Sequence, residues 1–224
     1  MSISDSRRVE FVARVTADMA HELRNVLAIV KETAGLIGDL TTLDTSNSPD
    51  HDKIMNLVAR VQRQADRGAK LTDVVHQVVR SCEDPGLPTE LNQAAAHVAV
   101  MSCRQARKKR QSVQVTPCDD ELHVLGRRLG VYVALHAATE CCLGLLPESA
   151  VLAVNLRPPT DGAPVDLMGS LGGIAVRIQP TRTPSWDSVR DAVADIGASL
   201  QAGNGNRILR IVFPLTSAGQ GIGS

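Results

Sequence analysis

Apolar residues follow a helical period over residues 6–40 of the chain. They recur at spacings of four and three, at Met19, Leu23, Val26, Val30, Thr33, Ile37 and Leu40, with Val12 and Val15 upstream. Apolar positions that recur in this way form one stripe along an α-helix. The pattern therefore predicts one long amphipathic helix.

A second periodic run follows after a break. The segment "TTLDTSNSPDHD" interrupts the first pattern with turn-forming residues and Pro49. The second stripe consists of Ile54, Leu57, Val61, Ala65, Gly68, Leu71, Val75 and Val78. It ends before Pro85 and Pro88, which terminate a helix and indicate a linker. Residues 1–84 are therefore predicted to form a helical hairpin.

Two helices cannot enclose a core, because each leaves part of its apolar stripe in water. Two such hairpins packed together bury both stripes in a four-helix bundle, which predicts a homodimer. The alternative is that the hairpin packs against the rest of its own chain.

The pattern changes after the linker, where helices and strands alternate with short turns. Helices are predicted at 89–109, 127–146 and 185–200, and strands at 112–117, 122–126, 150–158, 172–180 and 206–215. This order predicts an α/β sandwich domain over residues 89–217, followed by a loose tail at 218–224. The whole chain is thus predicted to be α+β.

Composition excludes several classes of protein. The 24 basic and 24 acidic side chains balance, which argues against bulk attraction to nucleic acid or to an anionic membrane. No apolar run reaches transmembrane length, and the five cysteines include no C-x-x-C pair. We therefore expect a cytoplasmic protein with free thiols and no metal site of its own.

The sequence "HELRN" lies within the first predicted helix. At 100° per residue, His21 lies roughly 160° from the apolar stripe, with Glu22 at the margin of this outward face. The outward face also carries Arg24, Asn25, Ala28 and Glu32. An exposed imidazole titrates near neutral pH and is a competent nucleophile, and a neighbouring carboxylate can handle its proton. On local chemistry alone, an ordinary surface histidine remains an open alternative.

"HELRN" followed by "VLAIV" on a long helix resembles the phosphoacceptor box of bacterial sensor histidine kinases. A dimerising hairpin before an α/β domain resembles the catalytic core of that family over residues 6–217. The resemblance implies that His21 accepts a phosphoryl group, that Glu22 assists proton transfer and that Asn25 positions water for dephosphorylation. Val26 stands where the family usually has proline, so the helix should lack the proline kink.

The C-terminal half departs from the family's ATP-binding motifs. His136 and Glu140 stand where the resemblance places two asparagines, one of them a magnesium ligand. The strand "GGIAVRIQP" ends in Gln179 and Pro180 without the aspartate that reads adenine. The segment "TRTPSWDSVRD" contains none of the glycines of the phosphate-binding lid. The fold is therefore expected to be kept and the nucleotide pocket lost, so no cofactor is expected to be bound stably.

A kinase core without its ATP site resembles the dimeric histidine phosphotransferases that derive from histidine kinases. The resemblance implies a phosphorelay carrier that passes a phosphoryl group between response-regulator aspartates through His21, without hydrolysing ATP. The implied partners are receiver domains, with a hybrid histidine kinase as a further candidate, and Mg²⁺ would arrive with the regulator. We expect docking near Arg24 and Ala28, where a small side chain leaves room for a partner helix. Three alternatives remain: a divergent ATP-dependent kinase, a regulator phosphatase and a non-catalytic dimeric adaptor.

Overall fold

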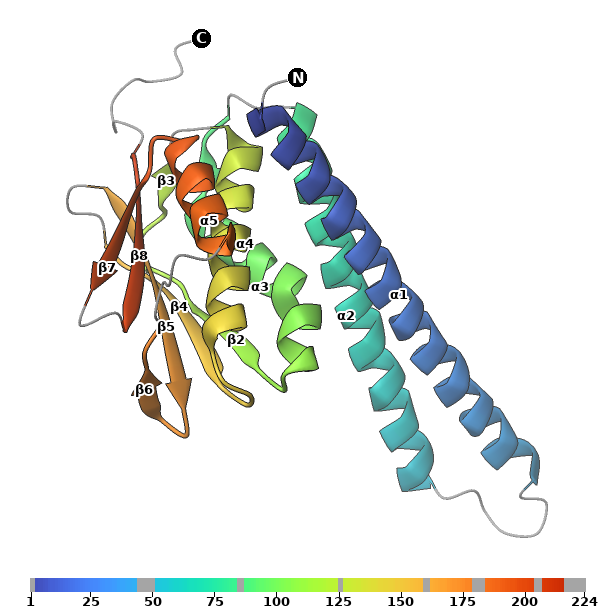
Figure 1. The fold of residues 1–224 in the computed structure, drawn as a ribbon. Helices are drawn as coiled ribbons and strands as arrows, with labels where there is room; N and C mark the ends of the chain where they lie inside the picture. Colours follow the sequence, from blue (N-terminus) through green and yellow to red (C-terminus); the bar gives the residue numbers. More distant parts are fainter. Residues whose placement is uncertain are drawn as a thin grey trace. The chain divides into compact units, whose positions relative to one another are not determined.

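The computed structural model describes residues 3–43, 51–83, 87–124, 127–158, 162–178, 184–203 and 207–215. It confirms the α+β architecture: α1 (Ile3–Leu43) and α2 (His51–Glu83) form a hairpin, and a sheet covered by helices follows (Figure 1). Residues 44–50 of the predicted break and the predicted tail at 218–224 lie outside the described residues, and the two ends of the break belong to α1 and α2. Among the helices that are described, none combines the length and apolar character needed to cross a membrane.

The chain divides into two compact units, which are described separately. The helical unit is Ala13–Gln77, and the C-terminal unit combines Met1–Val12 with Val78–Ser224. The first turns of α1 belong to the C-terminal unit because they pack there. Arg7 forms an ion pair of 2.5 Å with Asp191, and the ring of Phe11 lies edge-on to His136 at 5.3 Å between centroids.

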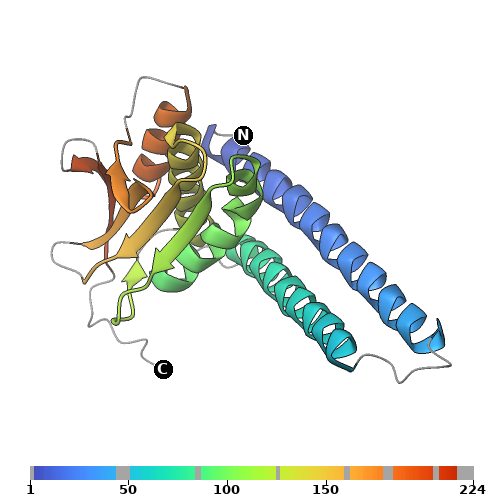
Figure 2. The same ribbon diagram turned by 90° about the horizontal axis from the view of Figure 1, so that it is seen from below.

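In the helical unit, α1 and α2 run antiparallel, side by side (Figure 2). The buried side chains of this unit are Val15, Met19, Glu22, Val26 and Thr33 of α1, with Leu71 and Val74 of α2. Glu22 and Val26 face Arg67 and Gly68 of α2. Leu23, Val30 and Ile37 were predicted in the same stripe but are only half-buried. The α2-facing stripe of α1 is therefore rotated from the predicted one, and it includes a carboxylate.

The C-terminal unit is built on a mixed sheet with the strand order β2-β4-β5-β8-β7. These strands are β2 (Ser112–Thr116), β4 (Val151–Leu156), β5 (Ala163–Leu171), β8 (Ile208–Phe213) and β7 (Ser199–Gly203). The β2–β4 pair is parallel and the other pairs are antiparallel. A short strand, β6 (Ile174–Val176), pairs with β5, and β1 (Thr89–Glu90) pairs with β3 (His123–Val124) as a separate ribbon.

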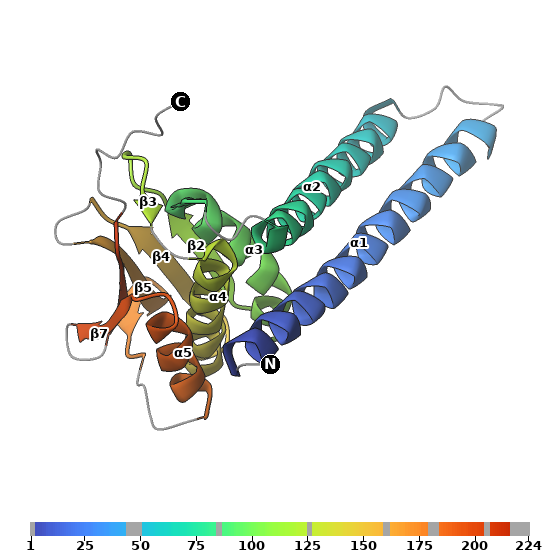
Figure 3. The ribbon, with the colours of Figure 1, turned by 90° about the horizontal axis from the view of Figure 1, so that it is seen from above.

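Three helices cover one face of this sheet: α3 (Leu91–Lys108), α4 (Arg128–Leu145) and α5 (Pro184–Ala194) (Figure 3). Alternate strand residues face these helices, and Leu152, Leu167 and Ile211 are fully buried there. The other face of the sheet carries no helix in the described part of the chain. The predicted strand at 206–215 corresponds to β8, which pairs with β7 in a hairpin, and the core is aliphatic because only four residues are aromatic.

The central strand β5 was not predicted, because its sequence "APVDLMGSL" contains proline, aspartate and glycine, which favour turns. The structure explains the positions of the aspartate and the glycine. Asp166 is only 1% exposed, yet it accepts two hydrogen bonds from Arg210 on the neighbouring strand, at 2.6 and 3.0 Å. Gly169 lies so close to the Leu146 side chain that a Cβ would clash with it.

Helix α5 ends earlier than predicted. Residues 185–200 were expected to be helical with Gly197 inside the helix, but the helix ends at Ala194 and residues 199–203 form β7. Gly197 adopts a left-handed φ of 68°, and the N–H of Ala198 donates to the carbonyl of Val193. This glycine therefore stops the helix, since a left-handed residue just beyond a helix end closes its last turn.

The contacts of Asp166 predict that Arg210 and Arg157 contribute differently to the free energy of unfolding. Arg210 donates two hydrogen bonds to this carboxylate, and they raise the pKa of its guanidinium, whereas Arg157 approaches it only to 3.6 Å. Arg210→Met should lower the free energy of unfolding by about 2 kcal/mol, because the buried carboxylate loses its main partner. Arg157→Met should cost less than about 0.5 kcal/mol, as expected for an exposed pair. Urea denaturation measures both, and equal losses would contradict this account of β5.

Candidate functional site in the helical unit

His21 lies in the middle of α1 with its side chain exposed. Arg24, Asn25 and Ala28, which share the predicted outward face, are exposed as well. A helix of this length holds the direction of its side chains, because each backbone amide in its interior is hydrogen-bonded. The imidazole can therefore be reached by a partner protein while its attachment to the hairpin stays rigid.

Glu22 is buried, whereas His21 next to it is exposed. It was placed at the margin of the outward face, but its residue is only 4% exposed. Arg67 on α2 donates a hydrogen bond to the Glu22 carboxylate and forms an ion pair with it. Consecutive helical residues point 100° apart, so the carboxylate lies on the α2 side and the imidazole on the solvent side.

The pairing of Arg67 with Glu22 was not predicted from the sequence, although the positions of both residues relative to the buried stripes indicate it. Glu22 lies three residues after Met19 and four before Val26, and both of these are fully buried. On α2, Arg67 lies four residues before Leu71, which is also buried. A carboxylate in one buried stripe and a guanidinium in the facing stripe indicate a buried ion pair, since a lone buried charge is costly.

A second apolar stripe on α1 is left uncovered within the described chain. It follows a strict alternation of three and four residues, through Ala13, Thr16, Ala20, Leu23, Leu27, Val30, Ala34, Ile37 and Thr41. We call these residues the α1 seam. All of them are exposed or half-buried, and Leu27 is 64% exposed. A 3–4 alternation of apolar and small residues is the spacing of a helix that packs against another helix at a shallow angle.

The α2 helix carries a matching stripe beside its α1-facing side. It runs through Ile54, Val58, Val61, Ala65, Gly68, Thr72 and Val75, with the same alternation of four and three. We call these residues the α2 seam, and they too are exposed or half-buried. Each helix of the hairpin therefore carries a second stripe beside the one that faces its neighbour. On α2 the two stripes meet at Gly68, where a Cβ would contact the side chain of Val26 on α1.

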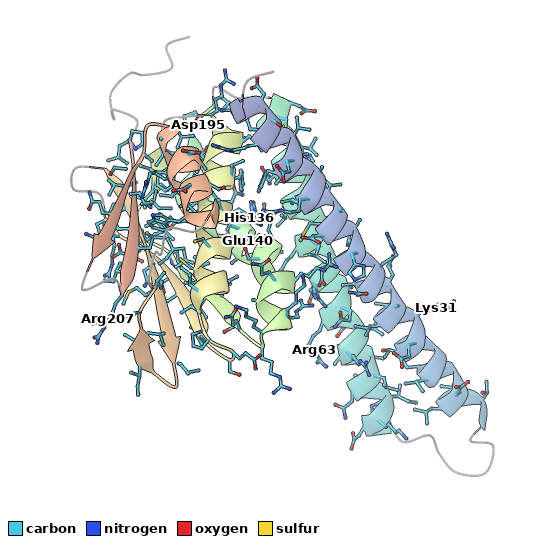
Figure 4. All side chains as sticks on the ribbon, viewed as in Figure 1. Lys31, Arg63, His136, Glu140, Asp195 and Arg207 are labelled. Carbon is cyan, nitrogen blue, oxygen red and sulfur yellow. The ribbon has the colours of Figure 1, made fainter. Side chains whose placement is uncertain are left out.

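In the C-terminal unit, the residues at the degenerate ATP motif make internal contacts. His136 and Glu140 lie one turn apart on α4, with 3.8 Å between Nε2 and Oε1 (Figure 4). His136 is buried and packs against the ring of Phe11, and His97 is bonded to the hydroxyl of Tyr132 at 2.9 Å. Across the described residues, no three His, Cys, Asp or Glu side chains are grouped so that they could hold a metal ion.

The basic segment 104–110 has a structural function at its end. The ammonium group of Lys109 donates to the carbonyls of Leu143 and Gly144, and the amide of Gln111 donates to those of Leu143 and Leu146. These donors satisfy the last carbonyls of α4, as cations do at a helix C-terminus. None of the five cysteines forms a disulfide, and burial raises the pKa of the Cys142 thiol, which disfavours the reactive thiolate.

Comparisons with known proteins give similarities of fold only. No family model and no curated protein matches the chain. Among solved structures, the histidine kinase AdeS of Acinetobacter baumannii is similar over 88% of this chain and 98% of its own, with 15% identity and a TM-score of 0.43. The histidine kinase domain of the blue-light activated histidine kinase of Erythrobacter litoralis EL346 is similar over 84% of this chain and 96% of its own, with 13% identity and a TM-score of 0.45.

The catalytic domain of the histidine kinase ThkA is similar over 58% of this chain and 97% of its own, with 14% identity and a TM-score of 0.48. All three scores lie below 0.5. The functional proposal therefore rests on the residues of this chain and not on those structures.

Proposed function

We propose that this chain is a histidine phosphotransferase of a two-component phosphorelay, which carries phosphoryl groups between response-regulator aspartates through His21. The observation that carries the proposal is an exposed imidazole in the middle of a long helix, on a side that belongs neither to the α2-facing stripe nor to the α1 seam. One side packs against α2, and the adjoining side is the α1 seam. The "HELRN" sequence around this imidazole resembles a phosphoacceptor box, and access from solvent is what attack on a partner's phosphoryl group requires.

The transfer step needs only one nucleophile from this chain. A ring nitrogen of His21 attacks the phosphorus of an aspartyl phosphate, so an N–P bond forms while the P–O bond to the aspartate breaks. The aspartate leaves as a carboxylate, and the ring regains neutrality by releasing its N–H proton to water. Transfer to a second regulator reverses these steps. Such in-line transfers depend on positioning and charge stabilisation, and the regulator would bring the Mg²⁺.

The neighbouring residues take separate roles in this proposal. Asn25 is exposed one turn from His21, where its amide could orient a water molecule during dephosphorylation of a regulator. Arg24 is exposed at the rim and could offset phosphoryl charge. Glu22 is buried against Arg67, so we assign it an indirect electrostatic role rather than direct proton transfer.

The proposed assembly is a homodimer in which two hairpins form a four-helix bundle. The α1 and α2 seams support it, because a stripe with a 3–4 alternation fits a second helix and no other described segment covers it. A second copy of the chain supplies a surface with the same spacing. His21 lies outside both seams and would remain accessible in such a dimer.

The C-terminal unit is proposed to act without ATP. The glycine lid and the adenine-reading aspartate are absent from the sequence, and His136 is buried against Phe11. Three alternative functions give different results in phosphorylation assays. A divergent kinase would be labelled by ATP, and a phosphatase would remove phosphate from a receiver domain without labelling of His21. An adaptor would do neither. Incubation with a phosphorylated receiver domain, followed by mass spectrometry of the peptide that contains His21, tests the proposal.

Docking of the regulator is tested by substitution at Ala28, which is exposed on the face of His21. Ala28→Arg should weaken binding of a receiver domain by about tenfold or more, because a long charged side chain fills the space that a partner helix would occupy. Helix content should not change. The matched control is Ala96→Arg, at an exposed alanine of α3. Titration of the receiver domain by calorimetry measures both, and equal affinity for the wild type and Ala28→Arg would place the docking face elsewhere.

A further inference from the structure

A row of polar side chains crosses the face of the sheet that α3, α4 and α5 leave uncovered in the described part of the chain (Figure 3). Asn155 of β4, Asp166 of β5, Arg210 of β8 and Gln201 of β7 lie opposite one another in the strand register. The neighbours of Asp166 along β5 are fully buried under the helices. Because side chains alternate along a strand, the polar row points away from the helices.

Two arginines of this face share a single carboxylate. The Asp166 side chain is only 2% exposed, whereas those of Arg210 and Arg157 are 43% and 57% exposed. Arg210 donates from Nε to Oδ1 at 2.6 Å and from Nη2 to Oδ2 at 3.0 Å, and Nε of Arg157 lies 3.6 Å from the same Oδ2. The two guanidinium groups are therefore neighbours, and one carboxylate compensates only one of their two charges. A second anion would complete the balance.

The contact with Asp166 leaves one edge of the Arg210 guanidinium for that second anion. A guanidinium carries five N–H donors in a rigid planar fork, and Asp166 accepts one from Nε and one from Nη2. The other three donors, on Nη1 and Nη2, form the outer edge, which fits a second carboxylate with two parallel hydrogen bonds. The buried carboxylate already fixes the Arg210 side chain, so less conformational entropy is lost when a ligand binds.

Apolar side chains lie on both sides of the polar row. Ala153, Met168 and Ile208 are in register on one side, and Pro164 and Val212 are in register on the other. All five are half-buried. Arginine and methionine beside apolar residues are typical of protein interfaces. The four aromatic residues of the chain are buried, so this face offers no ring on which a nucleic-acid base could stack.

We propose that this face binds a protein segment that places an aspartate or glutamate side chain against the guanidinium groups of Arg157 and Arg210. Apolar residues on either side of that acidic residue would pack on the two apolar rows. A protein segment is the occupant that fits, because it supplies both the carboxylate and the apolar contacts, whereas a free anion supplies only the charge. The inference does not depend on the proposed function of His21.

The first experiment selects peptides from a random phage-displayed library on the immobilised full chain. The selected peptides should share an aspartate or glutamate between apolar residues. Fluorescence anisotropy then measures the affinity of one selected peptide in synthetic form. Arg157→Gln should raise its dissociation constant by about tenfold or more, and replacing the acidic residue of the peptide by its amide should do the same. Arg157 is the position of choice because its side chain is exposed, so the fold tolerates the change.

Two further variants separate this site from a general effect of charge. Arg157→Lys keeps the charge but loses the planar fork, so it should weaken binding by about two- to fivefold. Arg80→Gln, at an exposed arginine of α2, should bind the peptide as the wild type does.

The second experiment supplies the carboxylate from the chain itself. Gln201 is exposed and lies directly opposite Arg210, so Gln201→Glu places a carboxylate beside the outer edge of the guanidinium. This variant should melt about 1–3 °C higher, because opposite charges on paired strands attract, and should bind the peptide about tenfold or more weakly. The matched control is Gln114→Glu, which adds the same charge on β2, three strands away, and should change the affinity less than about twofold.

Several results would overturn the proposal. One is a selection that returns no binding peptides or peptides without acidic residues. Another is equal affinity of the wild type and Arg157→Gln, or of the wild type and Gln201→Glu. A single-stranded DNA of about twelve nucleotides serves as the competing probe, and binding of this DNA that requires Arg157, without binding of any peptide, would identify a nucleic-acid site instead.

Discussion

Replacing His21 with alanine is expected to abolish phosphoryl acceptance completely. The imidazole nitrogen is the atom that would form the N–P bond, and alanine offers no nucleophile in its place. The fold should not change, because the His21 side chain is exposed and packs against neither α2 nor the core. The assay measures acid-labile, base-stable radiolabel after incubation with a phosphorylated receiver domain.

The matched control for this experiment is His76→Ala, at an exposed histidine of α2. This variant should take up label as the wild type does. Circular dichroism and the oligomeric state should be the same for both variants and the wild type. If His21→Ala still takes up label, or if label is lost in His76→Ala instead, then "HELRN" is not the phosphoacceptor.

Leu27→Glu is expected to convert the protein from a dimer to a monomer at micromolar concentration. In a single chain the Leu27 side chain is 64% exposed, so glutamate costs the isolated hairpin little. In the proposed dimer the side chain is buried in the seam, and the substitution places two glutamates, one from each copy, in the interface. Burying a carboxylate without a partner costs several kcal/mol, so the dissociation constant should rise by about a hundredfold or more.

The control for the seam is Leu36→Glu on the same helix. Leu36 is also an exposed large apolar residue, at 44%, but it lies outside the α1 seam. The substitution has the same chemistry, so a general effect of charge on α1 would appear in both variants. Sedimentation velocity of the full chain measures the oligomeric state. A monomeric wild type, or equal dissociation of the two variants, would contradict the seam as the interface.

Periodicity was sufficient to predict the hairpin, because both helices are long and their apolar residues recur over many turns. It was not sufficient to give the direction of each stripe. The α1 helix has two adjacent apolar stripes, one facing α2 and one outward. When all apolar residues are assigned to one face, residues of the two stripes are combined. Leu23 and Val30 were therefore assigned to the same face as Met19, and Glu22 to the solvent margin.

The C-terminal half was harder to predict, because its central strand breaks local rules. Asp166 and Gly169 disfavour a strand, and only their neighbours explain them: Arg210 pairs with the carboxylate, and the Leu146 side chain fills the space beside the glycine. Both partners are distant in sequence, so no local pattern contains them. Gly197 was misplaced for another reason, because a glycine near a helix end can lie inside the helix or terminate it.

The most direct test of the carrier function is to compare two phosphoryl donors on the same protein in the presence of Mg²⁺. One donor is radiolabelled ATP alone. The other is each receiver domain encoded in the same genome, phosphorylated on its aspartate and purified. We expect rapid labelling of His21 by at least one receiver domain and no labelling by ATP at millimolar concentration. Labelling by ATP alone would identify a kinase, and no labelling by any receiver domain would contradict the proposed function.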